Sequence, residues 1–399
     1  MGLLAALQYH QSLLSGAESN HAEIEYCLHS WGALFQPFIG DREHSVAARF
    51  ILHEFPFKLF SSSTPYDDPL PQKLTLTFRA PHEVHNSIPR FYSSGFFPHE
   101  IAEEFAAFLS LVTRRRVFAL QQTRYDGLPM TQVAHIYEKT HSQEQQVVKE
   151  IQPEEIYRLL DNLTHLEKTV ADGFLLAMRL YHAAIQLIYT EPEFSYLLLV
   201  TSLEAASSVA FSDFKPEDVD AYLDARFPDW ENYLNALPDT QRAEFRQFLL
   251  KNEFFTFRKL HAFVSSNLPD EFWSQTADDA KPDYLKHIFS AGADGIGRST
   301  VSHSDKSLQP WETIHQDELK AVLKNVYEAR SQLVHSGTRF PRSIVMGHYR
   351  LLPPEAFGEL LSGSGETGLS KPKIPPLLTF ERLTSLALTG FLRNTGHCK

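Results

Sequence analysis

The chain has 399 residues, of which 43% are hydrophobic and 22% are charged, and its formal net charge at pH 7 is −12. This composition is typical of a folded globular protein and excludes a disordered chain, while the length favours two domains over a single core. The negative charge argues against broad, non-specific binding to duplex nucleic acid, which needs many phosphate contacts, but it leaves room for a small basic pocket. The apolar runs are too short to predict a membrane-spanning helix.

Cysteine usage and the first residues indicate the compartment. Cys27 and Cys398 are the two cysteines of the sequence, which argues against a disulfide framework and for a reducing compartment. The segment MGLLAALQYHQSLL lacks a basic start and a small-residue cleavage site, so we expect no signal peptide. We therefore expect a cytoplasmic protein that does not associate with membranes.

Residues 1–145 mix helical and strand patterns, which predicts a mixed α/β N-terminal domain. A short helix is predicted from Leu3 to Leu14, and an amphipathic helix between Pro98 and Arg116. Four stretches rich in β-branched and aromatic residues and bounded by turn formers predict strands: IEYCLHSWGALF, VAARFILHEFPFKLF, KLTLTFRA and VFALQQTRY.

From residue 146 to residue 399 the pattern becomes nearly all helical. TVADGFLLAMRLYHAAIQLIY and FSYLLLVTSLEAASSVAF are apolar around most of their circumference, which predicts two buried helices separated by Glu191-Pro192. Further helices are predicted at DTQRAEFRQFLLKNEFFTFRKLHAFV, near DYLKHIFS, and from about Asp317 to His335. A loop from Leu351 to Pro376 leads to a short amphipathic helix, LTFERLTSLALTGFLRN. The predicted fold class is thus α+β and multidomain, with an all-α domain over residues 146–399.

Three short motifs have ordinary explanations. Residues 292–299 (GADGIGRS) fit the spacing of a phosphate loop, but the preceding strand and following helix that such a loop needs are not predicted there. His82 and His85 form HEVH, which lacks the spacing of a zinc-protease motif and has no nearby cysteine or acidic cluster. Arg114, Arg115 and Arg116 could contact nucleic acid, yet basic residues are common at a helix C-terminus. We expect no cofactor and no metal.

The helix that ends at His335 contains an arginine where its pattern calls for a hydrophobic residue. Leu319, Val322, Leu323 and Val326 form a stripe at spacings of three and four, and the next position on it is Arg330. A buried guanidinium needs an acidic partner or a bound anion. Glu204, which lies on the stripe of Leu197 and Val200 in another apolar helix, is the acid that we expect to contact Arg330.

His335 follows Arg330 by five residues, in the last turn of the same helix, where the helix dipole favours a positive charge. Five residues separate two side chains by roughly 140° on an ideal helix, so the two share a face only where the helix ends or at an interface. The pair has two interpretations. It is either a phosphate-binding and proton-transfer site, or a structural Arg330–Glu204 ion pair with His335 as a polar helix cap.

At these residues the sequence resembles the HEPN superfamily, and within it the Apea-like HEPN group. The signature of that family is an arginine followed after four to six residues by a histidine near the end of a late helix, here Arg330-Ser-Gln-Leu-Val-His335. The stretches YLLLVTSLEAASS, FRKLHAFVSSNLPDEFW and KIPPLLTFERLTSLALTGFL are also similar. The resemblance covers roughly residues 150–395.

The resemblance implies a metal-independent endoribonuclease of prokaryotic antiviral defence or of a toxin–antitoxin system, with RNA as its partner. His335 would act as general acid or base, Arg330 would hold the phosphate, and Glu204 would orient Arg330 or help with proton transfer. Ser331 stands where active members often have Asn or Asp. The resemblance further implies a homodimer, an antitoxin or phage-derived trigger as partner, and a sensor or specificity role for residues 1–145. The alternative function is a non-catalytic HEPN module that dimerises and binds RNA, a nucleotide or a protein.

Overall fold

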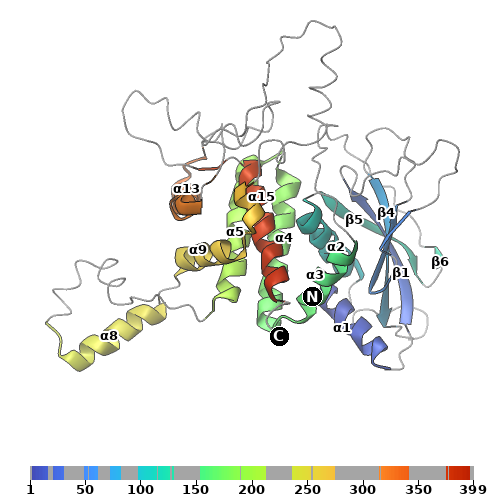
Figure 1. Cartoon of the computed structure of the whole chain (residues 1–399), viewed down its shortest axis with the longest axis horizontal. Coiled ribbons are helices and arrows are strands. Elements are labelled where there is room, and N and C mark those ends of the chain that lie inside the picture. The colour runs from blue at the N-terminus through green and yellow to red at the C-terminus, as the bar shows by residue number, and fades with distance from the viewer. Residues whose placement is uncertain are drawn as a thin grey trace, which may run out of the picture.

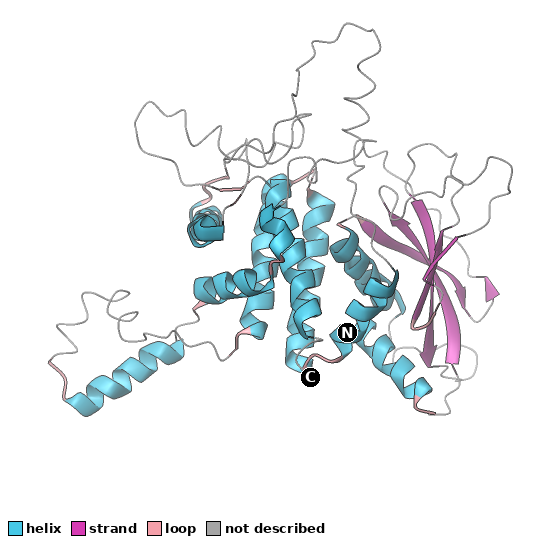
Figure 2. Cartoon of the chain, in the orientation of Figure 1, coloured by secondary structure: helices cyan, strands magenta, loops and turns pink. Residues whose placement is uncertain are grey.

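The computed structural model describes residues 2–16, 21–30, 49–52, 54–61, 72–81, 98–114, 116–125, 128–129, 153–188, 190–212, 236–252, 255–274, 314, 316–340, 374–375 and 377–395. These residues form a mixed α+β fold that is mostly helical. The helices gather on one side of the molecule and the strands form a sheet on the other (Figure 2). This arrangement agrees with the α+β class that the sequence predicts.

The sheet has six antiparallel strands in the order β2-β3-β4-β1-β5-β6. Its strands are β1 (His21–Ser30), β2 (Arg49–Leu52), β3 (Phe57–Ser61), β4 (Gln72–Pro81), β5 (Val117–Tyr125) and β6 (Leu128–Pro129). Alternate residues of β1, such as Ile24 and Leu28, are fully buried, as the period of two of a strand requires. The stretch VAARFILHEFPFKLF, predicted as one strand region, contains two strands, because a turn precedes Phe57. Tyr157 holds that turn by accepting from the Glu54 N–H (2.8 Å) and donating to its carbonyl (3.1 Å).

Most of the described helices pack against the sheet or against one another, whereas residues 239–252 extend away from them (Figure 1). They are α1 (Gly2–Leu14), α2 (Pro98–Thr113), α3 (Pro153–Thr164), α4 (Lys168–Leu187), α5 (Pro192–Ala210), α8 (Asp239–Asn252), α9 (Thr256–Asn267), α10 (Asp270–Ser274), α13 (Leu319–Ser336) and α15 (Leu377–Thr395). Residues 239–264, predicted as one helical stretch, are divided into α8 and α9. Phe255 adopts a left-handed φ of 50° before α9, which interrupts the helix. Among the described helices, none combines the length and apolar character needed to cross a bilayer.

Helices α4 and α5 form a hairpin whose backbones approach closely. Ser202 donates a hydrogen bond to the Ala177 carbonyl (2.6 Å) across the pair. Gly173 makes room for this approach, since a Cβ there would lie 2.3 Å from a methyl carbon of Val209. The two predicted buried helices are therefore confirmed as a packed pair.

Helix α15 lies at the centre of the helical layer and contacts α2, α3, α4, α5 and α9 (Figure 1). The sequence predicts a short amphipathic helix here, but the helix has 19 residues and is buried around nearly all of its circumference. Its buried residues include polar ones: Thr379, Glu381, Arg382, Thr384, Ser385 and Thr389. Buried polar groups need hydrogen-bond partners, and other helices supply several of them.

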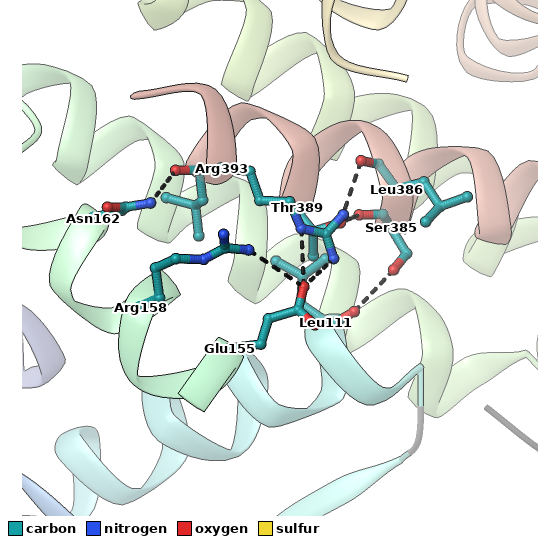
Figure 3. Close-up of polar contacts among 9 residues, drawn as sticks. Leu111, Glu155, Arg158, Asn162, Ser385, Leu386, Thr389 and Arg393 are labelled. Atoms are coloured by element: carbon teal, nitrogen blue, oxygen red, sulfur yellow. Dashed lines mark hydrogen bonds and ion pairs between the residues drawn. The ribbon is translucent and has the colours of Figure 1, made fainter. Parts of the chain in front are cut away.

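Polar contacts fix α15 to α2 and α3 along one side (Figure 3). Ser385 donates to the carbonyl of Leu111 in α2 (2.8 Å), and Asn162 of α3 donates to the carbonyl of Leu392 (2.9 Å). Arg393 donates from Nε to the Glu155 carboxylate of α3 (3.0 Å). These bonds set both the rotation and the axial position of α15.

A charged cluster fixes α15 near its start. The Glu381 side chain is 2% exposed, and its two oxygens accept hydrogen bonds from the Arg114 guanidinium at the end of α2. Tyr181 of α4 donates its hydroxyl proton to the same carboxylate (2.5 Å). Burial, followed by the Glu381 charge, holds the pKa of Tyr181 well above its ordinary value, so the hydroxyl remains a donor.

This cluster corrects the interpretation of the three consecutive arginines. Arg114 is used inside the fold as the partner of Glu381, and Arg116 is also buried, so neither residue serves as a solvated helix end. Arg115 lies outside the described residues, as does the predicted domain boundary between residues 145 and 146. One continuous apolar core runs from α1 and the sheet through α2 to α5, α9 and α15.

Gly390→Ala is expected to destabilise the fold by at least about 2 kcal/mol, although alanine normally favours a helix. A Cβ at Gly390 would lie 1.9 Å from the backbone oxygen of Asn267, so α15 and α9 would have to separate. Urea unfolding measures the change. Gly173→Ala is the matched control, because the atoms that it meets belong to the side chain of Val209 and not to backbone. An equal or larger loss for Gly173→Ala would contradict the expectation.

Arg114→Met is expected to cost about 3–5 kcal/mol in the free energy of unfolding, because it leaves the Glu381 carboxylate buried without its cation. Arg393→Met is the control on the same helix. Its ion pair with Glu155 is partly exposed, 34% and 28% for the two side chains, and its loss is expected to cost about 1 kcal/mol or less. Similar midpoints of urea unfolding for the two variants would show that the Glu381 cluster contributes no more to the unfolding free energy than the exposed Arg393–Glu155 pair.

Candidate functional site

Helix α13 carries three of the four residues that the sequence singles out. Its buried face consists of Leu319, Val322, Leu323 and Val326, which pack towards α9 and α5. Arg330 continues this face one turn later, as the stripe predicts, and its side chain is 23% exposed. The helix thus places a charged group on its core-facing side, at the edge of the packed region.

The expected contact between Arg330 and Glu204 is present. Nη2 of Arg330 donates a hydrogen bond of 3.2 Å to Oε2 of Glu204, which lies in α5. The Glu204 side chain is 13% exposed, so both charges are largely removed from water. Burial raises the pKa of the Glu204 carboxyl, and the Arg330 guanidinium opposes that rise. Arg330 therefore helps to keep Glu204 ionised.

Arg330 retains hydrogen-bonding capacity beyond this contact. Its Nε is buried and has no hydrogen-bond partner among the described residues. A guanidinium offers five donors in a fixed plane, a geometry that matches the oxygens of a carboxylate or phosphate. The buried Nε itself is closed to a ligand, so an anion would have to bind the part of the side chain that remains exposed, 23% of it.

His335 lies on a different side of α13. Its side chain is exposed in the last turn, and within the described part of the chain it forms no hydrogen bond or ion pair. The helix ends directly after it, because Gly337 has a φ of 68° and donates its N–H to the Leu333 carbonyl (3.2 Å). Arg330 faces α5 while His335 faces solvent, and the half-buried Ser331 follows Arg330. One chain thus brings Glu204 and Arg330 together but leaves His335 apart.

Two contacts that sequence reasoning missed hold the chain that leaves α13. The rings of Phe340 and Tyr196 are 4.6 Å apart, and Arg339 lies 3.9 Å from the Glu193 carboxylate, so residues 337–340 follow α5 towards its start. An aromatic residue shortly after a helix-ending glycine is the signal in the sequence, although it does not name the partner. These contacts limit the directions in which the end of α13, and His335 with it, can move.

The phosphate-loop-like residues 292–299 and the histidines His82 and His85 lie outside the described residues.

The unfolding free energy is expected to depend on pH through Glu204. The pKa of Glu204 is higher in the folded protein than in the unfolded chain. Between these two pKa values the native protein still binds a proton that the unfolded chain has lost, so the unfolding free energy falls as pH rises. Arg330→Met removes the positive charge that opposes the rise in the Glu204 pKa, so the loss of unfolding free energy extends to higher pH. Near neutrality the substitution is expected to cost about 2 kcal/mol.

Urea unfolding of Arg330→Met and of Arg330→Met/Glu204→Gln at several values between roughly pH 4 and pH 8 isolates this effect. The single variant is expected to lose stability relative to the double variant as pH rises, because glutamine cannot ionise. A difference between the two that does not change with pH would contradict the role of the Glu204 charge.

Comparison of the chain with protein-family models, with curated proteins and with solved structures gives no significant match.

Proposed function

We propose that the protein is a metal-independent endoribonuclease of the HEPN type that acts in the cytoplasm, in prokaryotic antiviral defence or in a toxin–antitoxin system. The observation that supports this proposal most is the Glu204–Arg330 pair, whose arginine side chain is still 23% exposed, five residues before an exposed histidine at a helix end. An arginine that can bind phosphate and a histidine that can exchange protons with solvent can supply charge stabilisation and one of the two proton transfers of RNA cleavage without a metal.

In the proposed reaction the RNA supplies its own nucleophile. The 2′-oxygen of a ribose attacks the adjacent phosphorus and loses its proton, while the bond from phosphorus to the 5′-oxygen breaks and that oxygen gains a proton. The products are a 2′,3′-cyclic phosphate and a 5′-hydroxyl. His335 performs one of the two proton transfers, and Arg330 stabilises the charge that develops on the phosphate oxygens. Glu204 holds the guanidinium in place and is a positioning residue.

The proposed active form is a homodimer. Arg330 and His335 lie on different sides of α13, so the histidine of one chain and the arginine of the other could reach one phosphate if two helix ends met. In this arrangement Ser331 donates or accepts a further hydrogen bond at the site. The N-terminal half with its sheet is then a sensor or specificity module, through which an antitoxin or a phage-derived trigger acts.

The second candidate function is a non-catalytic HEPN module that dimerises and binds RNA, a nucleotide or a protein. The contact between Arg330 and Glu204 is consistent with this second function, because a partly buried acid needs a cationic partner for the stability of the fold even if Arg330 has no catalytic role. The two functions differ in what His335 does, because the exposed histidine has no structural partner among the described residues.

His335→Ala is expected to abolish RNA cleavage, a reduction of at least about a hundredfold, with an unchanged melting temperature. Arg330→Ala is expected to abolish cleavage and also to lower the melting temperature, since Glu204 loses its partner. The measurements are cleavage of purified RNA, with end-group analysis for the cyclic phosphate, and growth on overexpression. Lys168→Gln, a change at an exposed residue of α4, is the control.

Wild type and His335→Ala that leave RNA equally intact, with and without extracts that contain the trigger, would refute the nuclease and favour the binding module. Size-exclusion chromatography with light scattering tests the dimer separately. Retained dimerisation in His335→Ala is needed to assign the loss of cleavage to the chemistry.

A further inference from the structure

The solvent side of α13 carries a second row of residues that ends at His335. Their spacings are four, three, four and four, which places all of them within an arc of roughly 80° on an ideal helix. Two lysines and the histidine are exposed, and the residues between them are half-buried. We call this set the α13 lysine row: Lys320, Lys324, Tyr327, Ser331 and His335.

The lysines of the row are available to a ligand. Lys320 forms no ion pair among the described residues, and its charge acts on His261 of α9, whose pKa is lowered first by burial and then by Lys320. Lys324 has one described partner, the Glu328 carboxylate at 3.7 Å, and both side chains are more than half exposed. An exposed pair of this kind contributes little and is easily exchanged for another anion.

The row has the length and the chemistry of a path for an extended anionic strand. Its 16 residues of helix, Lys320 to His335, rise by about 22 Å along the axis. Tyr327 lies between the lysines and the histidine, with its ring 6.1 Å from that of Phe257 in α9, so an aromatic surface is fixed midway. Cationic groups interleaved with an aromatic ring are the usual means of binding single-stranded nucleic acid.

The net charge of the whole chain makes this local row more informative. At −12 the protein repels polyanions at long range, so binding must come from a few placed cations and not from a broad basic surface. Two lysines one turn apart on one helix suit a single strand better than a duplex.

We propose that a single strand of RNA lies along the α13 lysine row, with Lys320 and Lys324 on phosphates several nucleotides from the one that is cleaved. The inference rests on the proposed function, because it places the strand relative to Arg330 and His335. Lys320 and Lys324 are binding residues here and take no part in the proton transfers.

The test is the salt dependence of RNA binding by the full chain. The probe is a fluorescein-labelled oligouridine with 2′-O-methyl groups, which lacks the nucleophile and is not cleaved. Lys320→Gln and Lys324→Gln are each expected to weaken binding and to lower the slope of log K against log salt by about 0.7, the value for one phosphate contact on a single strand. Glu328→Gln is expected to tighten binding, because Lys324 loses its competing carboxylate. Lys168→Gln, an exposed lysine of α4 without a described ion pair, is the control.

Unchanged affinity and slope in both lysine variants would overturn the inference, as would an equal loss in Lys168→Gln. Competition by polyglutamate as effective as by unlabelled RNA would also overturn it, since the row would then bind acidic protein segments. The inference would also be overturned if the wild type did not bind the labelled oligouridine.

Cleavable RNA separates this inference from the proposed function. If both are correct, the lysine variants raise KM and leave kcat nearly unchanged, whereas His335→Ala removes kcat. Binding that depends on the lysines in a wild type that cuts no RNA would support the row and refute the nuclease. Cleavage that depends on His335 but not on the lysines would support the nuclease and refute the α13 lysine row.

Discussion

The buried carboxylate of Glu381 is the constraint on which the arrangement of the helices depends. A negative charge that is 2% exposed is tolerated only with a cation and further donors, and Arg114 and Tyr181 supply them from α2 and α4. Because these three residues come from three helices, the ion pair can form in one relative placement only. The hydrogen bonds of Ser385 and Arg393 and the close approach of Gly390 to α9 restrict α15 in the same way, so the buried charge and these contacts together fix its position.

An aromatic contact between α15 and α5 links the position of α15 to the candidate site. Phe380 precedes Glu381, and its ring stacks on Tyr196 of α5 at 4.8 Å with an interplanar angle of 2°. Tyr196 also contacts Phe340, which follows α13, and its hydroxyl donates to the Pro375 carbonyl (3.1 Å). Helix α5 is thus held on one side by α15 and on the other by the chain that leaves α13. Glu204 lies two turns further along α5, so the acid that orients Arg330 is positioned by the same contacts that order the core.

The sequence is sufficient for the parts of the fold that depend on local pattern. The strands β1 and β4, the apolar helices α4 and α5, and the stripe of α13 that leads to Arg330 are confirmed. The Glu204–Arg330 contact is confirmed as well, because two charges on apolar faces need each other. The central position of α15 could not be predicted. Its polar residues look solvent-facing in the sequence, and the partner of Glu381 lies 267 residues away. The break at Phe255 and the division of residues 46–60 depend on backbone conformation and on Tyr157, which no periodicity reveals.

The central location of α15 has a consequence for the order in which the molecule is completed. During synthesis α15 leaves the ribosome after every other described element, yet it contacts five of the earlier helices. Until then α5 lacks the ring that stacks on Tyr196, α2 lacks the carboxylate that holds Arg114, and several apolar faces remain open. Such non-local contacts form slowly, because the entropy of a long loop must be overcome before they contribute. A nascent or truncated chain would thus carry Glu204, Arg330 and His335 without a fixed geometry. For the proposed ribonuclease, this would delay activity until α15 has been translated.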